Sequence, residues 1–250
     1  METHEKIVNW IQSYTQTNNI KSLVIGVSGG IDSAVTSTLC ALTGLPTYTI
    51  NLPIHQNPTL DCFSDIHIEW LKKFSNIVPL KLNLSGMFDS FVAAISRDIG
   101  TEFYNDLAFA NTKSRLRMIA LYQIAQAKNG IVVGTGNKVE DFGVGFFTKY
   151  GDGGVDISPI AGLLKSEVYR LGNILEIDKR IMQAPPTDGL WDDSRNDEDQ
   201  LGATYDELEW AMSASINDIT TEREQEVYDL YQKFHIKNKH KMIPIPMYIP

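Results

Sequence analysis

Short apolar runs alternate with segments of helical periodicity over roughly the first half of the chain. The apolar runs cover residues 21–27, 47–52, 77–82 and 131–133. Between and before them, apolar residues at helical spacing predict helices over residues 4–16, 34–42, 60–74 and 104–128. Because strands that are buried on both faces read as apolar runs, this alternation predicts a parallel sheet with helices on both faces.

The rest of the chain predicts helices but no further strong strand. Helical patterns occur near residues 164–175, 204–213 and 221–234, and the polar, acidic stretch 188–200 is expected to be a mobile loop. No internal repeat or low-complexity linker divides the sequence, so we expect one domain over residues 1–250. The predicted fold class is therefore α/β, a single domain whose parallel sheet is flanked by helices.

Composition and charge narrow the class of protein. The chain has 250 residues, of which 43% are hydrophobic and 21% charged, as is typical of globular proteins. Its net charge of -9 disfavours a general nucleic-acid or anionic-membrane surface, because such partners are usually met by clustered Lys and Arg. No stretch approaches the ~20 apolar residues of a membrane span, and no signal-peptide pattern opens the sequence, so we expect a cytoplasmic protein. Cys40 and Cys62 are expected to be buried thiols.

A glycine-rich loop after the first predicted strand carries the strongest chemical signal. Residues 26–33 read GVSGGIDS, which fits neither the Walker A loop nor the dinucleotide fingerprint. At the start of a helix, free backbone N–H groups and the helix dipole favour an anion, and glycines let a phosphate approach closely. Asp32 would repel that phosphate unless a cation lay between them, which indicates Mg2+. An ordinary turn with a capping Asp or Ser is the alternative.

Residues 134–156 form a second concentration of glycine and charged residues, directly after the fourth predicted strand. Ligands of parallel sheets bind where loops leave the carboxyl ends of the strands, so the loops 28–33, 53–57 and 134–156 are the candidates for one site. Glu140 suits a second carboxylate on the cation, and Lys149 suits a substrate phosphate or carboxylate. Asp152 or Asp156 could accept hydrogen bonds from a substrate. The alternative is a flexible, solvated loop, which could also act as a lid.

Several segments, in order along nearly the whole chain, resemble one family. The loop GVSGGIDS is similar to that of the N-type ATP pyrophosphatases, which cleave ATP between the α and β phosphates. Together with NTKSRLRMIA, GTGNKVEDFGVGFFTKYGDGGVDISPI, LLKSEV, PPTDGLW and KHK, it resembles NH3-dependent NAD+ synthetase. The resemblance implies an adenine nucleotide alpha hydrolase-like, Rossmann-like fold. It also implies a ligase that converts deamido-NAD+, ATP and ammonia into NAD+, AMP and pyrophosphate.

The resemblance further implies roles for individual residues. The ATP contacts would be Gly26, Val27, Ser28, Gly29, Gly30, Ile31, Asp32, Ser33, Thr135, Lys165 and Thr187. Mg2+ would be held by Asp32 and Glu140. The deamido-NAD+ contacts would be Arg115, Lys149, Asp156, His240 and Lys241. Asp152 is our choice for positioning ammonium or accepting its proton.

Each of these roles has a plainer alternative in the residues alone. Arg115 would make a surface salt bridge, Lys165 would be solvated, and Thr187 would cap a turn. His240 and Lys241 would belong to an exposed basic tail.

The sequence departs from the family pattern in two segments. Asp188 stands where we expect a small residue, and residues 51–53 lack the basic or Met residue expected beside adenine, so the adenine contacts stay open. We expect free ammonia as the nitrogen donor, because the synthetase segments leave no room for the glutamine-hydrolysing domain of some relatives. The resemblance also implies a homodimer with the dinucleotide site at the subunit interface. The largely apolar circumference of residues 104–128 fits a core and an interface equally.

Two other functions remain open. Another ATP pyrophosphatase, such as a tRNA-modifying enzyme that adenylates a base carbonyl, would share the phosphate loop. The acidic balance and the lack of paired cysteines disfavour it. A noncatalytic nucleotide-sensing protein would bind ATP, but it would not need both Asp32 and Glu140. Pyrophosphate release that depends on deamido-NAD+ would separate the three.

Overall fold

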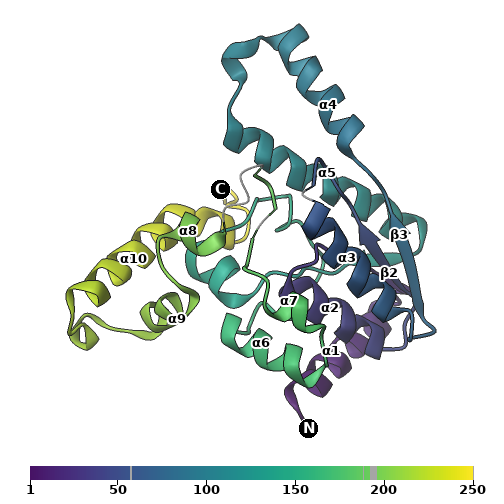
Figure 1. Ribbon diagram of the computed structural model, residues 1–250, viewed down its shortest axis with the longest axis horizontal. Coiled ribbons are helices and arrows are strands. Elements are labelled where there is room, and N and C mark those ends of the chain that lie inside the picture. The colour runs from purple at the N-terminus through teal and green to yellow at the C-terminus, as the bar shows by residue number, and fades with distance from the viewer. Residues whose placement is uncertain (57, 188, 192–195, 250) are drawn as a thin grey trace.

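A four-stranded parallel sheet with the strand order β3-β2-β1-β4 forms the centre of the molecule in a computed structural model (Figure 1). Residues 57, 188, 192–195 and 250 lie outside the described part of the chain, and of residues 58–61 only the backbone is described. The strands are β1 (Ser22–Gly26), β2 (Thr47–Asn51), β3 (Ile77–Lys81) and β4 (Gly130–Val132). Each pairing in the sheet is parallel.

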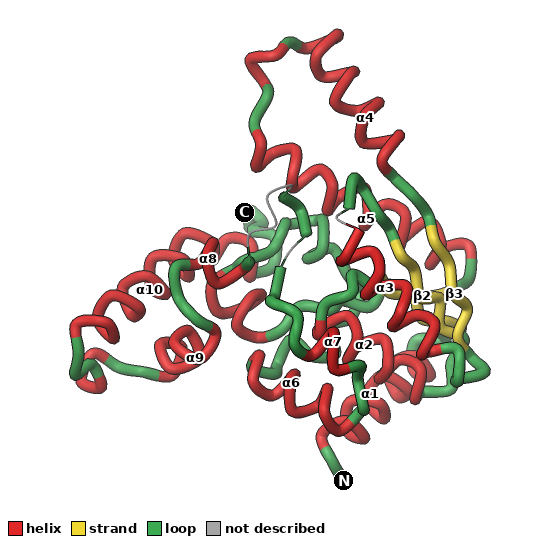
Figure 2. The backbone as a smooth tube through the Cα atoms, in the orientation of Figure 1, coloured by secondary structure: helices red, strands yellow, loops and turns green. Residues whose placement is uncertain are grey.

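Helices connect the strands and surround the sheet, as Figure 2 shows in red and yellow. The longer helices are α1 (Thr3–Thr17), α2 (Ile31–Leu42), α3 (Pro58–Leu71), α4 (Ser85–Ala94), α5 (Asp106–Ala127), α6 (Lys165–Ile174), α9 (Tyr205–Ser213) and α10 (Glu222–Met242). The shorter α-helices are α7 (Lys179–Met182) and α8 (Asp197–Leu201). Two π-helices, η1 (Ile95–Ile99) and η3 (Val139–Val144), and two 3-10 helices, η2 (Thr101–Phe103) and η4 (Ile216–Asp218), complete the described elements.

Side chains alternate along β1 between two apolar layers. Leu23 and Ile25 are fully buried against Ile11 of α1, on one face of the sheet. Val24 lies in a different cluster, with Leu116 of α5. Since both faces of β1 are covered, consecutive positions 23–25 are all apolar, which explains the absence of an alternating pattern. The predicted fold class, a parallel sheet flanked by helices on both faces, is confirmed.

The strand order creates a switch point between β1 and β4. From β1 the chain runs outward through β2 to β3, and it then returns to place β4 on the other side of β1. The loop 28–33 leaves the carboxyl end of β1, and the segment 134–156 follows β4. Open α/β sheets bind ligands at such a point, where neighbouring loops diverge. The two glycine-rich segments singled out in the sequence therefore meet at the expected edge.

The helices α8, α9 and α10 form a lobe beside the sheet, at the left of Figure 1. Their apolar cluster includes Leu201, Leu208 and Val227, and it extends to Val139 and Val144 of η3. The lobe thereby packs against the segment that follows β4. This packing brings the end of α10 to the candidate site.

Several elements differ from the predicted ones. Residues 197–200 were expected to be part of a mobile loop, but they belong to α8, whose cap Asn196 accepts a hydrogen bond from the Asp199 N–H. Asp188 and residues 192–195 of that stretch lie outside the described residues. α10 continues past the predicted end at residue 234, so His240 and Lys241 lie in its last turn and not in an extended tail. The prediction omitted α4, in which Phe88 is the only buried residue, with Val92 packed one turn later against the same cluster.

The two cysteines have different environments. Cys40 is buried in α2 as expected, and burial raises the pKa of its thiol to about 12. The expectation for Cys62 is wrong, because Cys62 is exposed. α3 directs Ser64, Ile68 and Leu71 towards the interior, and Cys62 lies off that helical face. Among the described residues, no helix combines the length and apolar character needed to cross a membrane.

Candidate active site

The loop between β1 and α2 is tied to the first turn of α2 by its serine hydroxyls. Gly29 has a φ of 92°, which a side chain would strain, and Gly30 is the N-cap of α2. The Ser33 hydroxyl donates to the Gly30 carbonyl over 2.9 Å and accepts the Ser28 N–H over 3.2 Å. The loop thus lies at the positive end of a buried helix, where an anionic phosphate is stabilised.

Three charged side chains from distant segments meet at this loop. Lys165 Nζ lies 2.6 Å from Asp32 Oδ2 and 2.9 Å from Glu140 Oε1. The Lys165 side chain is only 3% exposed, which contradicts the solvated alternative drawn from the residues alone. Asn137 holds the other side of the pair, since its Nδ2 donates to Asp32 Oδ1 over 3.1 Å. The two carboxylates predicted to share a cation therefore do converge on one positive atom.

The protonation of this triad follows from burial and charge together. Burial disfavours the ammonium of Lys165, but Asp32 and Glu140 outweigh it and raise the pKa of Lys165 above its ordinary value. Burial raises the pKa of Asp32 despite the attraction of Lys165. Burial also opposes the charge of Glu140, but Lys165 and a hydrogen bond from Tyr205 overcome it and lower the pKa of Glu140. The site therefore keeps Lys165 and Glu140 charged.

The donor set fits a magnesium ion that is bound jointly with a nucleotide. Mg2+ in nucleotide sites is usually held by one or two carboxylates together with substrate phosphates. Asp32 and Glu140 supply two carboxylates beside the phosphate loop. Within the described part of the chain, no group of three or more His, Cys, Asp or Glu residues is arranged to hold a metal. Further oxygen ligands would come from ATP phosphates and water.

Asp152 is fixed against α5 by a reciprocal set of hydrogen bonds. Its Oδ1 accepts the Ser114 hydroxyl over 2.6 Å and the Thr148 N–H over 3.0 Å, and its own N–H donates to Ser114 Oγ over 2.8 Å. A Cβ atom on Gly151 would lie 2.3 Å from Ser114 Oγ. The glycine-rich composition of this segment therefore permits a close approach to α5, and it does not indicate a free solvated loop.

Basic residues from three elements gather around the residues that follow η3. Lys241 Nζ donates to two carbonyl oxygens within residues 145–147, the second over 2.8 Å. Lys149 Nζ donates to the His240 carbonyl over 3.2 Å. Arg115 Nε donates to the Lys149 carbonyl over 3.3 Å, and among the described residues no acid forms the surface salt bridge with Arg115 that the residues alone favoured. Four of the predicted deamido-NAD+ contacts therefore lie together.

The other predicted contacts have separate surroundings. Asp156 accepts the Val132 N–H over 2.7 Å and the Tyr122 hydroxyl over 3.1 Å, so it caps the outer edge of β4. None of its hydrogen bonds within the described residues reaches the Lys149 group. Thr135 is partly buried just after β4. Thr187 accepts the Gly189 N–H over 3.2 Å, as a turn residue would.

The side chains that hold Glu140 and Asp32 in place were not predicted. Asn137 binds Asp32 and also accepts the N–H groups of Val139 and Glu140 at the start of η3. Its position three residues before Glu140 is typical of a capping Asn, and this was the available signal. The Tyr205 hydroxyl donates to Glu140 Oε1 over 2.6 Å across 65 sequence positions. No local pattern in the sequence connects those two residues.

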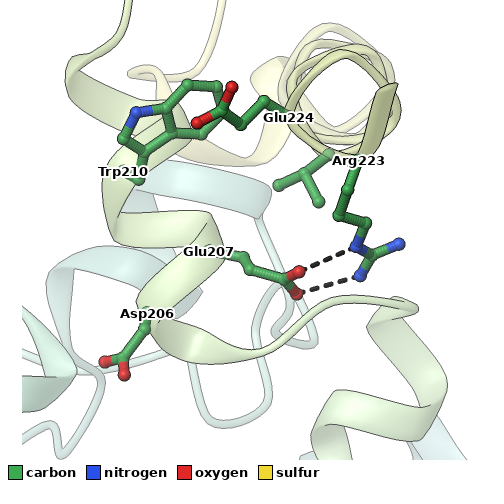
Figure 3. Close-up of a pocket in the computed structure, with 6 residues that line it drawn as sticks. Asp206, Glu207, Trp210, Arg223 and Glu224 are labelled. Carbon is green, nitrogen blue, oxygen red and sulfur yellow. Dashed lines mark hydrogen bonds and ion pairs between the residues drawn. The ribbon is translucent and has the colours of Figure 1, made fainter. Parts of the chain in front are cut away.

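A hollow of about 260 Å³ lies between α9 and α10 (Figure 3). Its lining residues are Asp206, Glu207, Trp210, Arg223, Glu224 and Val227. Figure 3 shows Glu207 and Arg223 joined across it by hydrogen bonds of 2.7 and 2.9 Å. None of these residues belongs to the predicted site, and their ion pair holds α9 against α10.

Known proteins resemble this chain in sequence over most of its length. The sequence profile of the NAD synthase family matches residues 3–244. An NH(3)-dependent NAD(+) synthetase from Mycoplasmopsis pulmonis is 39% identical over 205 residues, which cover 81% of this chain and 75% of the relative. A second NH(3)-dependent NAD(+) synthetase, from Carboxydothermus hydrogenoformans, is 34% identical over 252 residues, which cover 98% of this chain and 97% of the relative.

Solved structures show the same relationship. The NMN synthetase from Francisella tularensis is 34% identical, with a TM-score of 0.86 over 98% of this chain and 97% of that chain. The NH3-dependent NAD synthetase from Campylobacter jejuni shares the fold, with a TM-score of 0.77 at 24% identity over 100% of both chains. The resemblance drawn from the motifs is confirmed. The protein belongs to the NAD synthase family, as an ATP-using ligase of the ammonia-dependent NAD+ synthetase type that forms a carbon–nitrogen bond.

Proposed function

We propose that the protein converts deamido-NAD+, ATP and ammonia into NAD+, AMP and pyrophosphate. The observation that carries the proposal is the convergence of Asp32 and Glu140 at the phosphate loop. A group of basic side chains from α5, α10 and the segment after η3 would bind a second anionic ligand. Family membership over residues 3–244 favours this reaction over a tRNA-modifying enzyme or a nucleotide sensor.

The reaction needs activation of a carboxylate. A carboxylate repels nucleophiles and has oxide as its leaving group, so ammonia does not displace it at a useful rate. An oxygen of the nicotinate carboxylate instead attacks the α-phosphorus of ATP, and the bond to the bridging oxygen of pyrophosphate breaks. The nitrogen of ammonia then attacks the acyl carbon, AMP leaves, and a proton is lost from nitrogen. Each step releases a stable anion, and no covalent link to the protein forms.

The chain's own groups suit the first of these steps. The free N–H groups at the start of α2 and the hydroxyls of Ser28 and Ser33 would bind the pyrophosphate that leaves. Lys165 supplies a fixed positive charge beside them. When bound, Mg2+ held by Asp32 and Glu140 would neutralise charge on the phosphates.

Asp152 and the basic side chains around Lys149 suit the second step, the attack of ammonia on the acyl carbon. Hydrogen bonds from Ser114 and Thr148 hold the Asp152 carboxylate in one orientation. We assign it the role of binding ammonium and accepting a proton. Arg115, Lys149 and the end of α10 would bind the dinucleotide phosphates. The contact assigned to Asp156 stays a prediction.

A second copy of the chain would cover the region where α4 projects from the body, at the top of Figure 1. The exposed apolar side chains of this region, called the apolar patch below, are Met87, Phe91, Ile99, Phe103, Tyr104 and Leu107. Exposed apolar side chains in such number are typical of interaction sites. Both roles considered for residues 104–128 are compatible with α5, because Leu116 is buried in the core while Leu107 is 58% exposed and accessible to a partner. We therefore propose a homodimer. The expected cytoplasmic location stays a prediction.

Pyrophosphate release tests the proposed reaction. We expect release with deamido-NAD+ and ATP, and NAD+ formation only when ammonium is added. Asp32→Asn should lower the rate roughly 100-fold or more, because it removes charge at the leaving group. Asp229→Asn, which alters an exposed acid on α10, is the matched control and should leave the rate unchanged.

Different outcomes would support different functions. ATP binding without pyrophosphate release would favour a nucleotide sensor. Comparable rates with glutamine would contradict free ammonia as the nitrogen donor. Because a solved relative is an NMN synthetase, the acid form of that mononucleotide is the second candidate substrate. A higher kcat/KM for nicotinate mononucleotide than for deamido-NAD+ would replace the dinucleotide in our proposal.

A further inference from the structure

Tyr205 connects the helical lobe to the carboxylate pair. It is only 6% exposed, and its hydroxyl donates to Glu140 Oε1 over 2.6 Å. Lys165 Nζ binds the same oxygen and lies 4.7 Å from the centre of the Tyr205 ring. The hydroxyl also lies 3.4 Å from Asp197 Oδ2. The Tyr205 side chain therefore contacts both Glu140 and the Lys165 ammonium group that is paired with it.

The backbone of Tyr205 is fixed from several directions. Tyr205 opens α9, directly after the N-cap Thr204, and its N–H donates to Glu198 Oε1 over 2.9 Å. The Glu207–Arg223 pair in Figure 3 ties the same turn to α10. A hydroxyl on such a rigid base has a defined position. It is suited to setting the orientation of a partner.

α9 also holds the start of α6, the helix that carries Lys165. Glu209 accepts the Ser166 N–H over 2.8 Å and the Ser166 hydroxyl over 2.7 Å. Lys165 precedes Ser166 as the first residue of α6. α9 is therefore bonded to both sides of the Lys165–Glu140 pair, through Tyr205 on one side and Glu209 on the other.

We propose that Tyr205 is a positioning residue, which sets the orientation of the Glu140 carboxylate towards a divalent cation through its hydroxyl. The inference rests on the proposed function, because it takes Glu140 as a metal ligand. A purely structural role would need only some acceptor for a buried hydroxyl. The acceptor used here is the oxygen that Lys165 also binds, so loss of the hydroxyl frees one side of that carboxylate to rotate.

Mn2+ binding in the presence of ATP, followed by electron paramagnetic resonance, tests the proposal without relying on turnover. Tyr205→Phe keeps the ring and removes the hydroxyl. We expect its Mn2+ affinity to fall about tenfold or more, the usual effect of losing a hydrogen bond to a metal ligand. Tyr231→Phe is the control, because Tyr231 packs in the same apolar cluster without a hydrogen-bond partner for its hydroxyl in the described chain. It should bind Mn2+ like the wild type.

A double-variant comparison separates positioning from folding. If Tyr205 acts through Glu140, Tyr205→Phe should have little further effect on Mn2+ affinity in a Glu140→Gln background. The Glu140→Gln background can also be used if the single Tyr205→Phe variant fails to fold. It removes the Glu140 charge, so loss of the Tyr205 hydroxyl no longer leaves that buried charge without its hydrogen bond. An additive effect would overturn the inference. So would a lower melting temperature with unchanged Mn2+ affinity.

The wild-type result distinguishes the two levels of the proposal. If the wild type binds no Mn2+ with ATP, the metal assignment to Asp32 and Glu140 fails and the inference fails with it. If the wild type binds Mn2+ and Tyr205→Phe binds it equally well, the proposed function stands and only the role of Tyr205 is refuted.

Discussion

The buried Lys165 is electrostatically bound to two acids, and each of the three side chains depends on the others. Its Nζ is within 2.9 Å of Glu140 and 2.6 Å of Asp32, and none of the three side chains is more than 17% exposed. A buried ionic cluster of this kind adds little net stability when all of its members are present. Removing one partner is costly, because a charge then stays buried without compensation.

Lys165→Met should therefore destabilise the fold by about 3–5 kcal/mol. Urea unfolding at neutral pH measures the change. The double variant Lys165→Met with Glu140→Gln should lose less, because it removes one of the two stranded charges. Added Mg2+ should raise the free energy of unfolding of Lys165→Met more than that of the wild type. Equal losses in the single and double variants would show that the charges are not coupled.

Gly151 is the residue on which the close approach of Asp152 to α5 depends. In Gly151→Ala, the new Cβ would lie 2.3 Å from Ser114 Oγ and 2.9 Å from Thr148 Cβ, so the segment must move away. We expect a destabilisation of about 1–3 kcal/mol and a higher KM for ammonium, because Asp152 loses its orientation. Gly162→Ala is the control, since nothing lies within 4 Å of its Cβ position. Steady-state assays across ammonium concentrations would reveal a contradiction if both variants behaved alike.

At the scale of elements, α2 and α3 are joined by a buried polar contact. His67 of α3 is 1% exposed, with Nε2 3.0 Å from the Ser37 hydroxyl of α2, and it stacks on Trp70. Burial lowers the pKa of His67 to about 4, from an ordinary value of 6.5. The folded protein therefore keeps this imidazole neutral at pH values where the unfolded chain takes up a proton.

The sign of the resulting pH dependence follows from that difference. The stability associated with neutral His67 is complete above pH 6.5 and is lost as the pH falls from 6.5 towards 4. A shift of this size corresponds to about 3 kcal/mol. Urea unfolding of the wild type and of His67→Gln between pH 7.5 and 4.5 measures it. The variant should show a shallower decline, and parallel declines would refute the assignment.

The elements that could be predicted from sequence are those with local signals. Residues 23–25 of β1 are all apolar because both faces of the strand are covered, and GVSGGIDS predicts a phosphate loop by its own spacing. α10 extended beyond its predicted end because contacts of Lys241 with residues 145–147 hold its last turn. The η3 helix within residues 134–156 was missed because the glycines of the surrounding segment resemble those of a loop.

The convergence of the two proposed metal ligands was predictable from the sequence, but the side chains that hold them in place were not. Asp32 and Glu140 follow neighbouring strands, so topology alone brings them together. Tyr205 reaches Glu140 only because α9 packs on η3, and packing of that kind leaves no periodic trace in the sequence. Lys149 was predicted as a substrate contact from its own segment, whereas Arg115, His240 and Lys241 were assigned to the site only through the family resemblance, because the residues alone favoured a surface salt bridge and an exposed basic tail.

At the scale of the whole molecule, the projecting α4 region governs self-association in our proposal. Leu107→Asp places a charge in the exposed apolar patch, where Leu107 is 58% exposed. We expect the wild type to sediment as a dimer at micromolar concentration and Leu107→Asp to shift towards the monomer. Ile216→Asp, at a 71% exposed position on η4, is the matched control and should stay dimeric. A monomeric wild type would refute the homodimer.

The contact between Lys165 and Asp32 also has a consequence for the folding of the chain. It joins residues 133 positions apart, and the Asn137–Asp32 contact spans 105. Closing such long loops costs entropy before any attraction repays it, and parallel sheets fold slowly for the same reason. We therefore expect this contact to be among the last to form, so that the chain gains its charged site only at the end of folding.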